Sequence, residues 1–139
     1  VMEQLAVEIV GLCREYGECR VEVERMEEVR RVKNALESVC VVARRKLDIS
    51  DPALLLALLD AYEVTRDEGM LQEVLDVVGR NLDRLAVSAE SVKLLACCYY
   101  YVEEEECAER ARRMLEELRK MGRGEEELAD AETILEELT

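Results

Sequence analysis

The residues best suited to a chemical role lie together in one stretch of the sequence. Three consecutive tyrosines are followed, one residue later, by four consecutive acids: Tyr99, Tyr100, Tyr101, Glu103, Glu104, Glu105 and Glu106. Tyrosine combines an apolar ring with a polar hydroxyl and is favoured at binding surfaces, and a run of carboxylates attracts a basic segment of another molecule. Because successive residues of a helix point about 100° apart, the three rings cannot share one buried face. We therefore expect one of these tyrosines to reach the surface.

The alternative interpretation of this stretch is purely structural. Two of the tyrosines would then belong to the core, and the third would lie at a seam between packed helices. The four acids would stabilise the N-terminus of a helix, where the helix dipole favours carboxylates. The sequence leaves both interpretations open.

No arrangement typical of an active site accompanies these residues. The chain contains no histidine, which removes the commonest proton shuttle, and it has no glycine-rich phosphate loop. Among 33 acids, no pair of carboxylates stands out as a general acid and base. The adjacent Cys97 and Cys98 could be a redox pair, but no neighbour favours a thiolate, and a buried position is the simpler interpretation. We expect no enzyme, no cofactor and, without a Cys-x-x-Cys pair, no metal.

Length and composition indicate one domain. A chain of 139 residues suffices for a sizeable core, and half of its residues are hydrophobic. No apolar run approaches the roughly 18 residues of a membrane span, so we expect no membrane insertion. The spacing of the six cysteines does not suggest a disulfide framework, which favours reduced thiols and an intracellular, reducing compartment. The first residue is valine, and we interpret the chain as a piece excised from a longer protein.

The acidic charge is concentrated in the C-terminal two thirds of the chain. The formal net charge is −14: residues 1–50 carry nine basic and ten acidic side chains, and residues 51–139 carry ten and twenty-three. Such a surface repels nucleic-acid phosphates, although a local basic stripe can still bind them. The residues that could form a stripe are Arg30, Arg31, Lys33, Arg44, Arg45 and Lys46. Glu27, Glu28 and Glu37 are interleaved with them, so a lattice of surface ion pairs is the alternative.

Helix-forming residues dominate, and one proline and six glycines leave few breaks between them. We predict seven helices: 2–16, 20–47 with room for a break before residue 26, 52–66, 70–85, 89–103, 104–121 and 125–138. Gly17 is expected to end the first helix, and Gly69 to allow a turn before the fourth. Ser50 or Asp51 is expected to cap the third helix, and Ser88 the fifth.

Helices that are apolar on all sides alternate with helices that are apolar on one face. Residues 52–66 and 89–103 are of the first kind, and 70–85 and 104–121 are of the second. The first kind aligns at an offset of 37, which places Tyr62 on Tyr99, and the second kind aligns best at 36. This period is typical of stacked helical hairpins, in which one helix of each pair is covered on both sides by neighbours.

Residues 89–122 hold a recognisable series, namely Val92, Leu95-Ala96, Tyr99 and Ala108. The series resembles the tetratricopeptide pattern, which has an aromatic residue, Leu-Gly, Tyr and Ala in these places but a slightly shorter spacing and a closing proline. The chain is also similar to pentatricopeptide and HEAT-like proteins, and the resemblance covers about half of it. The resemblance implies a right-handed superhelix of helical hairpins, an α-solenoid.

The sequence therefore predicts an all-α fold of stacked antiparallel hairpins with about seven helices in a single domain, 1–139. Its expected segments are hairpins at 1–48, 50–86 and 88–122 and a closing helix at 124–139. The expected function is a scaffold or adaptor for a basic or amphipathic segment of a partner protein, with Tyr62 and one of Tyr99, Tyr100 and Tyr101 as anchors. The alternative is an RNA-processing factor of the pentatricopeptide kind. The C-terminal helix is a candidate homo-oligomer contact.

Overall fold

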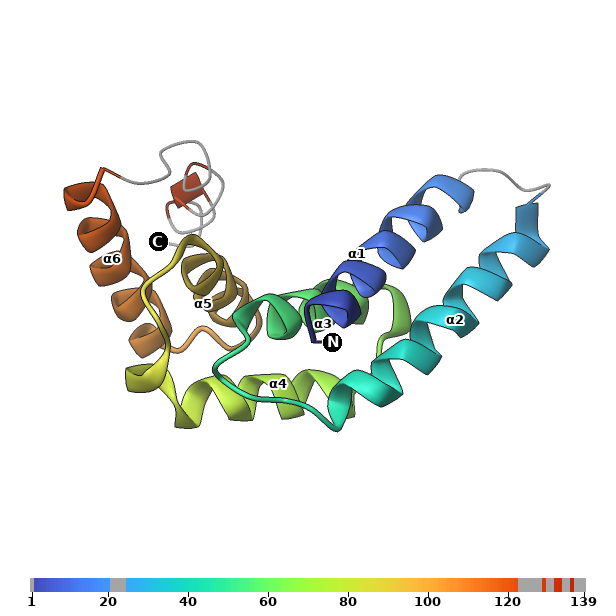
Figure 1. The fold of residues 1–139 in the computed structure, drawn as a ribbon, viewed down its shortest axis with the longest axis horizontal. Coiled ribbons are helices and arrows are strands. Elements are labelled where there is room, and N and C mark those ends of the chain that lie inside the picture. The colour runs from blue at the N-terminus through green and yellow to red at the C-terminus, as the bar shows by residue number, and fades with distance from the viewer. Residues whose placement is uncertain (1, 21–24, 123–128, 130–131, 134–135, 137–139) are drawn as a thin grey trace. The chain divides into compact units, whose positions relative to one another are not determined.

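The described part of the chain is all-helical, which confirms the predicted fold class at that level. The computed structural model describes residues 2–20, 25–122, 129, 132–133 and 136. These residues contain no strand; up to residue 122 they form six α-helices and a short 3-10 helix, Leu82–Arg84 (Figure 1), and residues 129, 132–133 and 136 are also helical. The α-helices are α1 (Met2–Cys19), α2 (Met26–Arg44), α3 (Pro52–Thr65), α4 (Glu68–Arg80), α5 (Ala89–Val102) and α6 (Glu105–Lys120). Most of the predicted helix 125–138 lies outside the described residues.

The predicted end of the first helix at Gly17 is wrong. Gly17 does not adopt the left-handed backbone that ends a helix, and α1 continues through it to Cys19. The additional turn brings the Cys19 side chain into the core, where it is 0% exposed. The second helix begins at Met26, where a break was anticipated, and it ends at Arg44.

Both predicted ends of the fourth helix are also displaced. α4 begins at Glu68 because Asp67 precedes it and Asp67 Oδ1 accepts a hydrogen bond from the Met70 N–H at 3.1 Å. Gly69 therefore lies inside the first turn of the helix. α4 ends before Asn81, whose side-chain amide donates to the Val77 carbonyl at 2.7 Å. Such a local side-chain bond competes with continuation of the helix.

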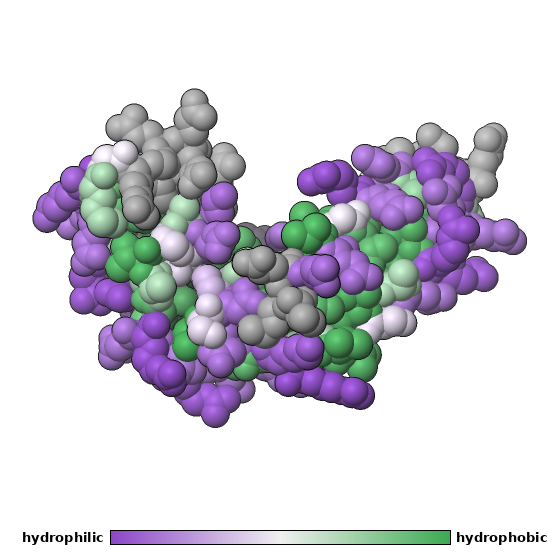
Figure 2. Space-filling view, in the orientation of Figure 1, coloured by the Kyte–Doolittle hydropathy of each residue, from purple (hydrophilic) through white to green (hydrophobic). Residues whose placement is uncertain are grey.

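The chain forms two compact units, residues 1–74 and 75–139, with the boundary inside α4. In the first unit, α1 packs against both α2 and α3, and α2 also contacts α3. Figure 2 shows hydrophobic residues gathered where α1 and α2 meet and hydrophilic residues around the outer edges of this pair. Cover from two helices explains why α3 is apolar on nearly all sides; its buried residues are Leu54, Leu55, Ala57, Leu58, Leu59, Ala61 and Tyr62.

In the second unit, α5 packs against α6 (Figure 1). At 100° per residue, the buried residues of α5 span about 200° of the helix: Ser91, Val92, Leu94, Leu95, Ala96, Cys98 and Tyr99. Those of α6 follow one face, at the spacing of an amphipathic helix: Cys107, Ala108, Ala111, Met114, Leu115 and Leu118. The buried face of α5 is therefore broader than that of α6, although it does not extend round the whole helix.

The two enclosed helices correspond to each other in length and in both ends. α3 and α5 have 14 residues each, and every position in α5 is 37 residues after its counterpart in α3. Both begin with a side-chain cap: Asp51 Oδ1 accepts from the Leu54 N–H at 3.2 Å, and Ser88 Oγ accepts from the Ser91 N–H at 3.1 Å. Both end in a left-handed residue that is not glycine, with φ angles of 55° at Arg66 and 53° at Glu103.

The one-faced helices correspond at the same offset, so the predicted offset of 36 for them is wrong. α4 begins at Glu68 and α6 at Glu105, 37 residues later. Buried residues of α4 then fall on buried residues of α6: Met70 on Cys107, Leu71 on Ala108, Val74 on Ala111 and Val78 on Leu115.

The left-handed end of α5 leads to a prediction about stability. This conformation costs a residue with a side chain about 1 kcal/mol, so Glu103→Gly is expected to raise the free energy of unfolding by about 0.5 kcal/mol after the added entropy of an unfolded glycine is subtracted. The same change at Glu109, which is exposed inside α6, is expected to lower it by about 1 kcal/mol. Urea unfolding followed by circular dichroism measures both. A loss of stability at Glu103 would contradict the left-handed cap.

Candidate functional site

The junction of α5 and α6 exposes an aromatic ring beside several acids, and we name residues 100–106 the tyrosine–glutamate corner. Tyr100 is 61% exposed, whereas Tyr99 is 9% exposed and Tyr101 is half-buried. One tyrosine therefore reaches the surface, as expected. The rings of Tyr100 and Tyr101 meet edge to face, with centroids 5.2 Å apart and planes at 83°. This geometry is favourable for an aromatic pair and orients the exposed ring.

The acids of the corner are exposed and largely without basic partners. Glu103 closes α5, and its backbone N–H donates to the Tyr99 carbonyl at 2.7 Å. Glu104 precedes α6 in an extended conformation, and its side chain caps nothing. Glu105 forms an ion pair with Arg112 at 3.3 Å. Within the described ranges, the carboxylates of the other three acids have no ion pair, so negative charge is in excess in the segment that follows Tyr100.

Tyr62, the other predicted anchor, is a core residue of the first unit. It is 7% exposed, and its hydroxyl donates a hydrogen bond to Glu68 Oε1 at 2.5 Å. This bond, together with desolvation, raises the pKa of Tyr62 above its usual value. The guanidinium of Arg66 lies 5.7 Å from the ring centroid, within the range of a cation–π contact. Because Tyr62 and Tyr99 expose so little of their rings, we do not include them in the candidate site.

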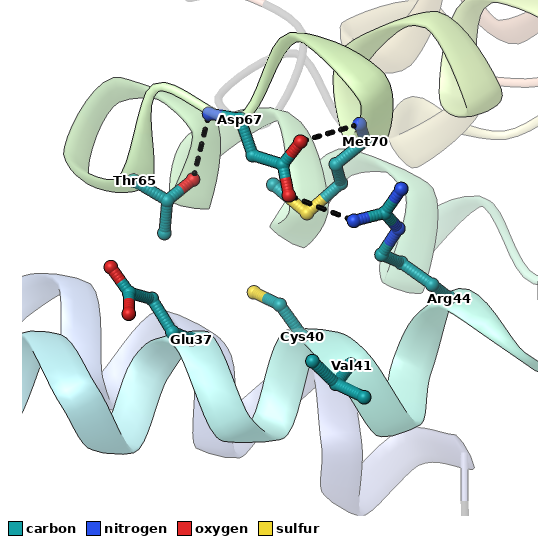
Figure 3. Close-up of a pocket in the computed structure, with 7 residues that line it drawn as sticks. All are labelled: Glu37, Cys40, Val41, Arg44, Thr65, Asp67 and Met70. Carbon is teal, nitrogen blue, oxygen red and sulfur yellow. Dashed lines mark hydrogen bonds and ion pairs between the residues drawn. The ribbon is translucent and has the colours of Figure 1, made fainter.

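A second site, which sequence reasoning missed, is a pocket of about 410 Å³ in the first unit. We name it the Arg44 pocket. Figure 3 shows that one wall comes from the C-terminal half of α2 and the other from the end of α3, the connecting residue Asp67 and the first turn of α4. Its lining residues are Glu37, Cys40, Val41, Arg44, Thr65, Asp67 and Met70. No motif in the sequence marks this site, because its walls are distant in the chain.

Arg44 is held at one end of the pocket by two acids. Its Nε and Nη2 donate to Glu73 Oε2 and Oε1 at 3.0 and 2.6 Å, and its Nη1 donates to Asp67 Oδ2 at 2.8 Å. This forked arrangement suits a planar guanidinium. The hydrogen bonds to Glu73 raise the pKa of Arg44 above its already high usual value. Gly69 leaves room for the pair, since a Cβ there would lie 3.3 Å from Asp67 Oδ1 and 3.4 Å from Arg44 Nη2.

The floor of the Arg44 pocket is apolar. Met70 is 1% exposed and Cys40 is 4% exposed. Burial raises the pKa of the Cys40 thiol to about 11, so the thiol is protonated at neutral pH and is a poor nucleophile. Cys13 is similar, with a pKa raised to about 11 mainly by burial. None of the six cysteines forms a disulfide in the structure, and four of them are buried: Cys19, Cys40, Cys98 and Cys107.

The ion pairs of Arg44 predict a pH-dependent contribution to stability. Hydrogen bonds from Arg44 hold the pKa of Glu73 below its usual value of 4.5. The resulting stabilisation is present above pH 4.5 and is lost as the pH falls through the lower pKa of the folded protein. Arg44→Met keeps an apolar stem, and we expect it to lower the free energy of unfolding by about 1 kcal/mol at pH 7, after discounting for solvent screening of half-exposed acids. Below about pH 4 the difference is expected to shrink.

Urea unfolding at both pH values measures this difference. Arg45→Met is the matched control, because Arg45 is exposed and follows directly in the chain; we expect it to change the unfolding free energy little. A deficit in Arg44→Met that stays constant from neutral to acidic pH would contradict the role assigned to Glu73.

The predicted basic stripe on α2 is only partly available for binding. Arg44 is engaged by its two acids, whereas Arg30 and Arg31 are exposed. The remaining members are half-buried Lys33 and exposed Arg45 and Lys46. Glu28 pairs with Arg25 at 2.6 Å, and the ion pairs of the described residues do not include the lattice predicted from Glu27, Glu28 and Glu37.

Comparisons with protein-family models, curated proteins and solved structures find no match to this chain. No group of three or more Cys, Asp or Glu in the described ranges could hold a metal ion. None of the helices formed by the described residues has the length and apolarity to cross a membrane. The functional interpretation therefore depends on the two sites themselves.

Proposed function

We propose that this chain is a protein-interaction module, a stack of helical hairpins that binds a basic or amphipathic segment of a partner protein at the tyrosine–glutamate corner. The observation that carries the proposal is the 61% exposure of Tyr100 next to the exposed acids that follow it. Tyrosine is over-represented among the residues that dominate binding energy at interfaces. Neighbouring carboxylates speed the approach of a basic partner and orient it.

The first unit contains an internal example of the recognition that we propose. At the junction of α3 and α4, Asp67 accepts a hydrogen bond from the guanidinium of Arg44. Glu104 occupies the place 37 residues after Asp67, at the junction of α5 and α6. There no described basic side chain pairs with it, which leaves a partner free to supply one. The correspondence does not extend to Glu73, since Arg110 lies 37 residues after it.

The test places a photo-crosslinking amino acid, p-benzoylphenylalanine, at position 100 in the whole chain and at Glu116 as a control. Glu116 is an exposed residue of α6. After irradiation in nuclease-treated lysate, we expect a discrete protein adduct at position 100 and none at 116. Its yield is expected to fall between about 0.05 and about 0.3 M salt, because screening weakens the attraction of the acids for a basic segment.

Three other outcomes would count against the proposal. An adduct that contains RNA would favour the RNA-binding alternative, with Arg30 and Arg31 as the first residues to replace. An adduct of the chain with itself would indicate a homo-oligomer rather than an adaptor. Equal labelling at positions 100 and 116 would show that the corner has no specific partner.

A further inference from the structure

The Arg44 pocket combines an apolar floor with acidic walls, and nothing in the proposed function uses it. Figure 3 shows Glu37 and Cys40 projecting from α2 toward Thr65 and Met70 on the facing segment. Its volume of about 410 Å³ is within the roughly 300–1,000 Å³ of typical ligand sites. We propose that the Arg44 pocket binds one cationic side chain, an arginine or a lysine, of a partner protein.

The charge balance of the pocket favours a cation. The positive charge of Arg44 is already shared between Asp67 and Glu73 through three hydrogen bonds. Glu37 adds a third carboxylate, and within the described ranges it has no ion pair. Two acids and one base line the pocket, and Glu73 binds that base, so the site retains a net negative charge. An anionic ligand would have to displace Glu73 or Asp67 from Arg44.

The distribution of polar and apolar groups matches a long side chain with a charged end. The thiol of Cys40, the thioether of Met70 and the isopropyl group of Val41 provide apolar surface for the methylene stem, as long basic side chains prefer. The Glu37 carboxylate is then available to the charged head group. Thr65 lies opposite Glu37 and has a hydroxyl that already accepts a hydrogen bond from the Asp67 N–H at 3.4 Å.

The experiment uses the whole chain with isotope-labelled methyl groups and capped amino acids as probes. N-acetyl-arginine amide and N-acetyl-lysine amide are titrated, with N-acetyl-leucine amide as the neutral control. We expect saturable shifts of the Met70 and Val41 methyl resonances with the basic probes at a Kd of about 1 mM, and none with leucine. Glu37→Gln is expected to weaken binding about fivefold, as the loss of one partly exposed ion pair predicts.

Glu27→Gln is the matched control, because Glu27 is an exposed acid of the same helix, and we expect it to leave the affinity unchanged. Unsaturable shifts, equal shifts with the leucine probe, or an unchanged affinity in Glu37→Gln would overturn the assignment. If spermidine binds more tightly than the amino-acid probes, the ligand of the pocket is a free polyamine and not the side chain of a partner protein. This proposal concerns a different site from the tyrosine–glutamate corner. The crosslinking experiment at position 100 does not test the Arg44 pocket, and the titration of the pocket does not test the corner.

Discussion

Replacing Leu95 by alanine is expected to lower the free energy of unfolding by about 3 kcal/mol. Leu95 is 0% exposed, in the middle of α5, the enclosed helix of the second unit. Truncation removes apolar surface from the core and leaves a cavity that the surrounding side chains fill only in part. Since a domain is stable by only about 5–15 kcal/mol, the loss is expected to shift the urea midpoint clearly.

Val102→Ala provides the control within the same helix. Val102 is 38% exposed at the C-terminal end of α5, and we expect its truncation to change the unfolding free energy by less than about 0.5 kcal/mol. Chemical unfolding followed by circular dichroism measures both variants. A change of less than about 1 kcal/mol for Leu95→Ala would be incompatible with an enclosed α5.

Truncation of Tyr100 is expected to weaken binding of the crosslinked partner about thirtyfold, equivalent to about 2 kcal/mol, with little change in stability. The ring is 61% exposed, so its removal leaves no cavity in the core. Tyr99→Ala is the informative comparison, because Tyr99 is 9% exposed. That variant is expected to lose about 3 kcal/mol of stability, and any loss of binding would follow from unfolding.

Titration calorimetry with the purified partner gives the affinities, and urea unfolding gives the stabilities. The two variants separate recognition from folding, which simultaneous replacement of Tyr99, Tyr100 and Tyr101 would not do. If Tyr100→Ala binds the partner with unchanged affinity, the tyrosine–glutamate corner does not contribute to the interface, even if a partner had been crosslinked at position 100.

The starts of the enclosed helices were predictable because the signal is local. Asp51 and Ser88 cap α3 and α5 through hydrogen bonds that span three residues. The ends of α3 and α5 were predicted to within one residue, at 66 and 103, but not the type of helix end that closes them. Gly17 resembles a C-cap and is not one, whereas the left-handed caps are Arg66 and Glu103, residue types that rarely adopt this conformation. The position of a glycine alone therefore does not show where these helices stop.

The two sites differ in how well they can be predicted from the sequence. Helical geometry alone predicts that one of three successive tyrosines is exposed, but the identity of Tyr100 depends on which face of α5 is covered. The Arg44 pocket has no local signal, since Arg44 and Glu73 are 29 residues apart. Only the packing of the first unit brings these two residues together, so no local sequence pattern predicts their contact.

Because α3 and α5 begin and end in the same way, the segment from one helix start to the next could be duplicated without creating a new type of helix end. A copy of residues 52–88 inserted after Ser88 would begin behind a serine cap and would finish with the same cap before Ala89. Both junctions of the inserted copy would therefore have a helix start of a type that the chain already contains. Proteins built on such joints can lengthen or shorten by whole cassettes through duplication and deletion of gene segments, while the surface of each cassette diverges independently.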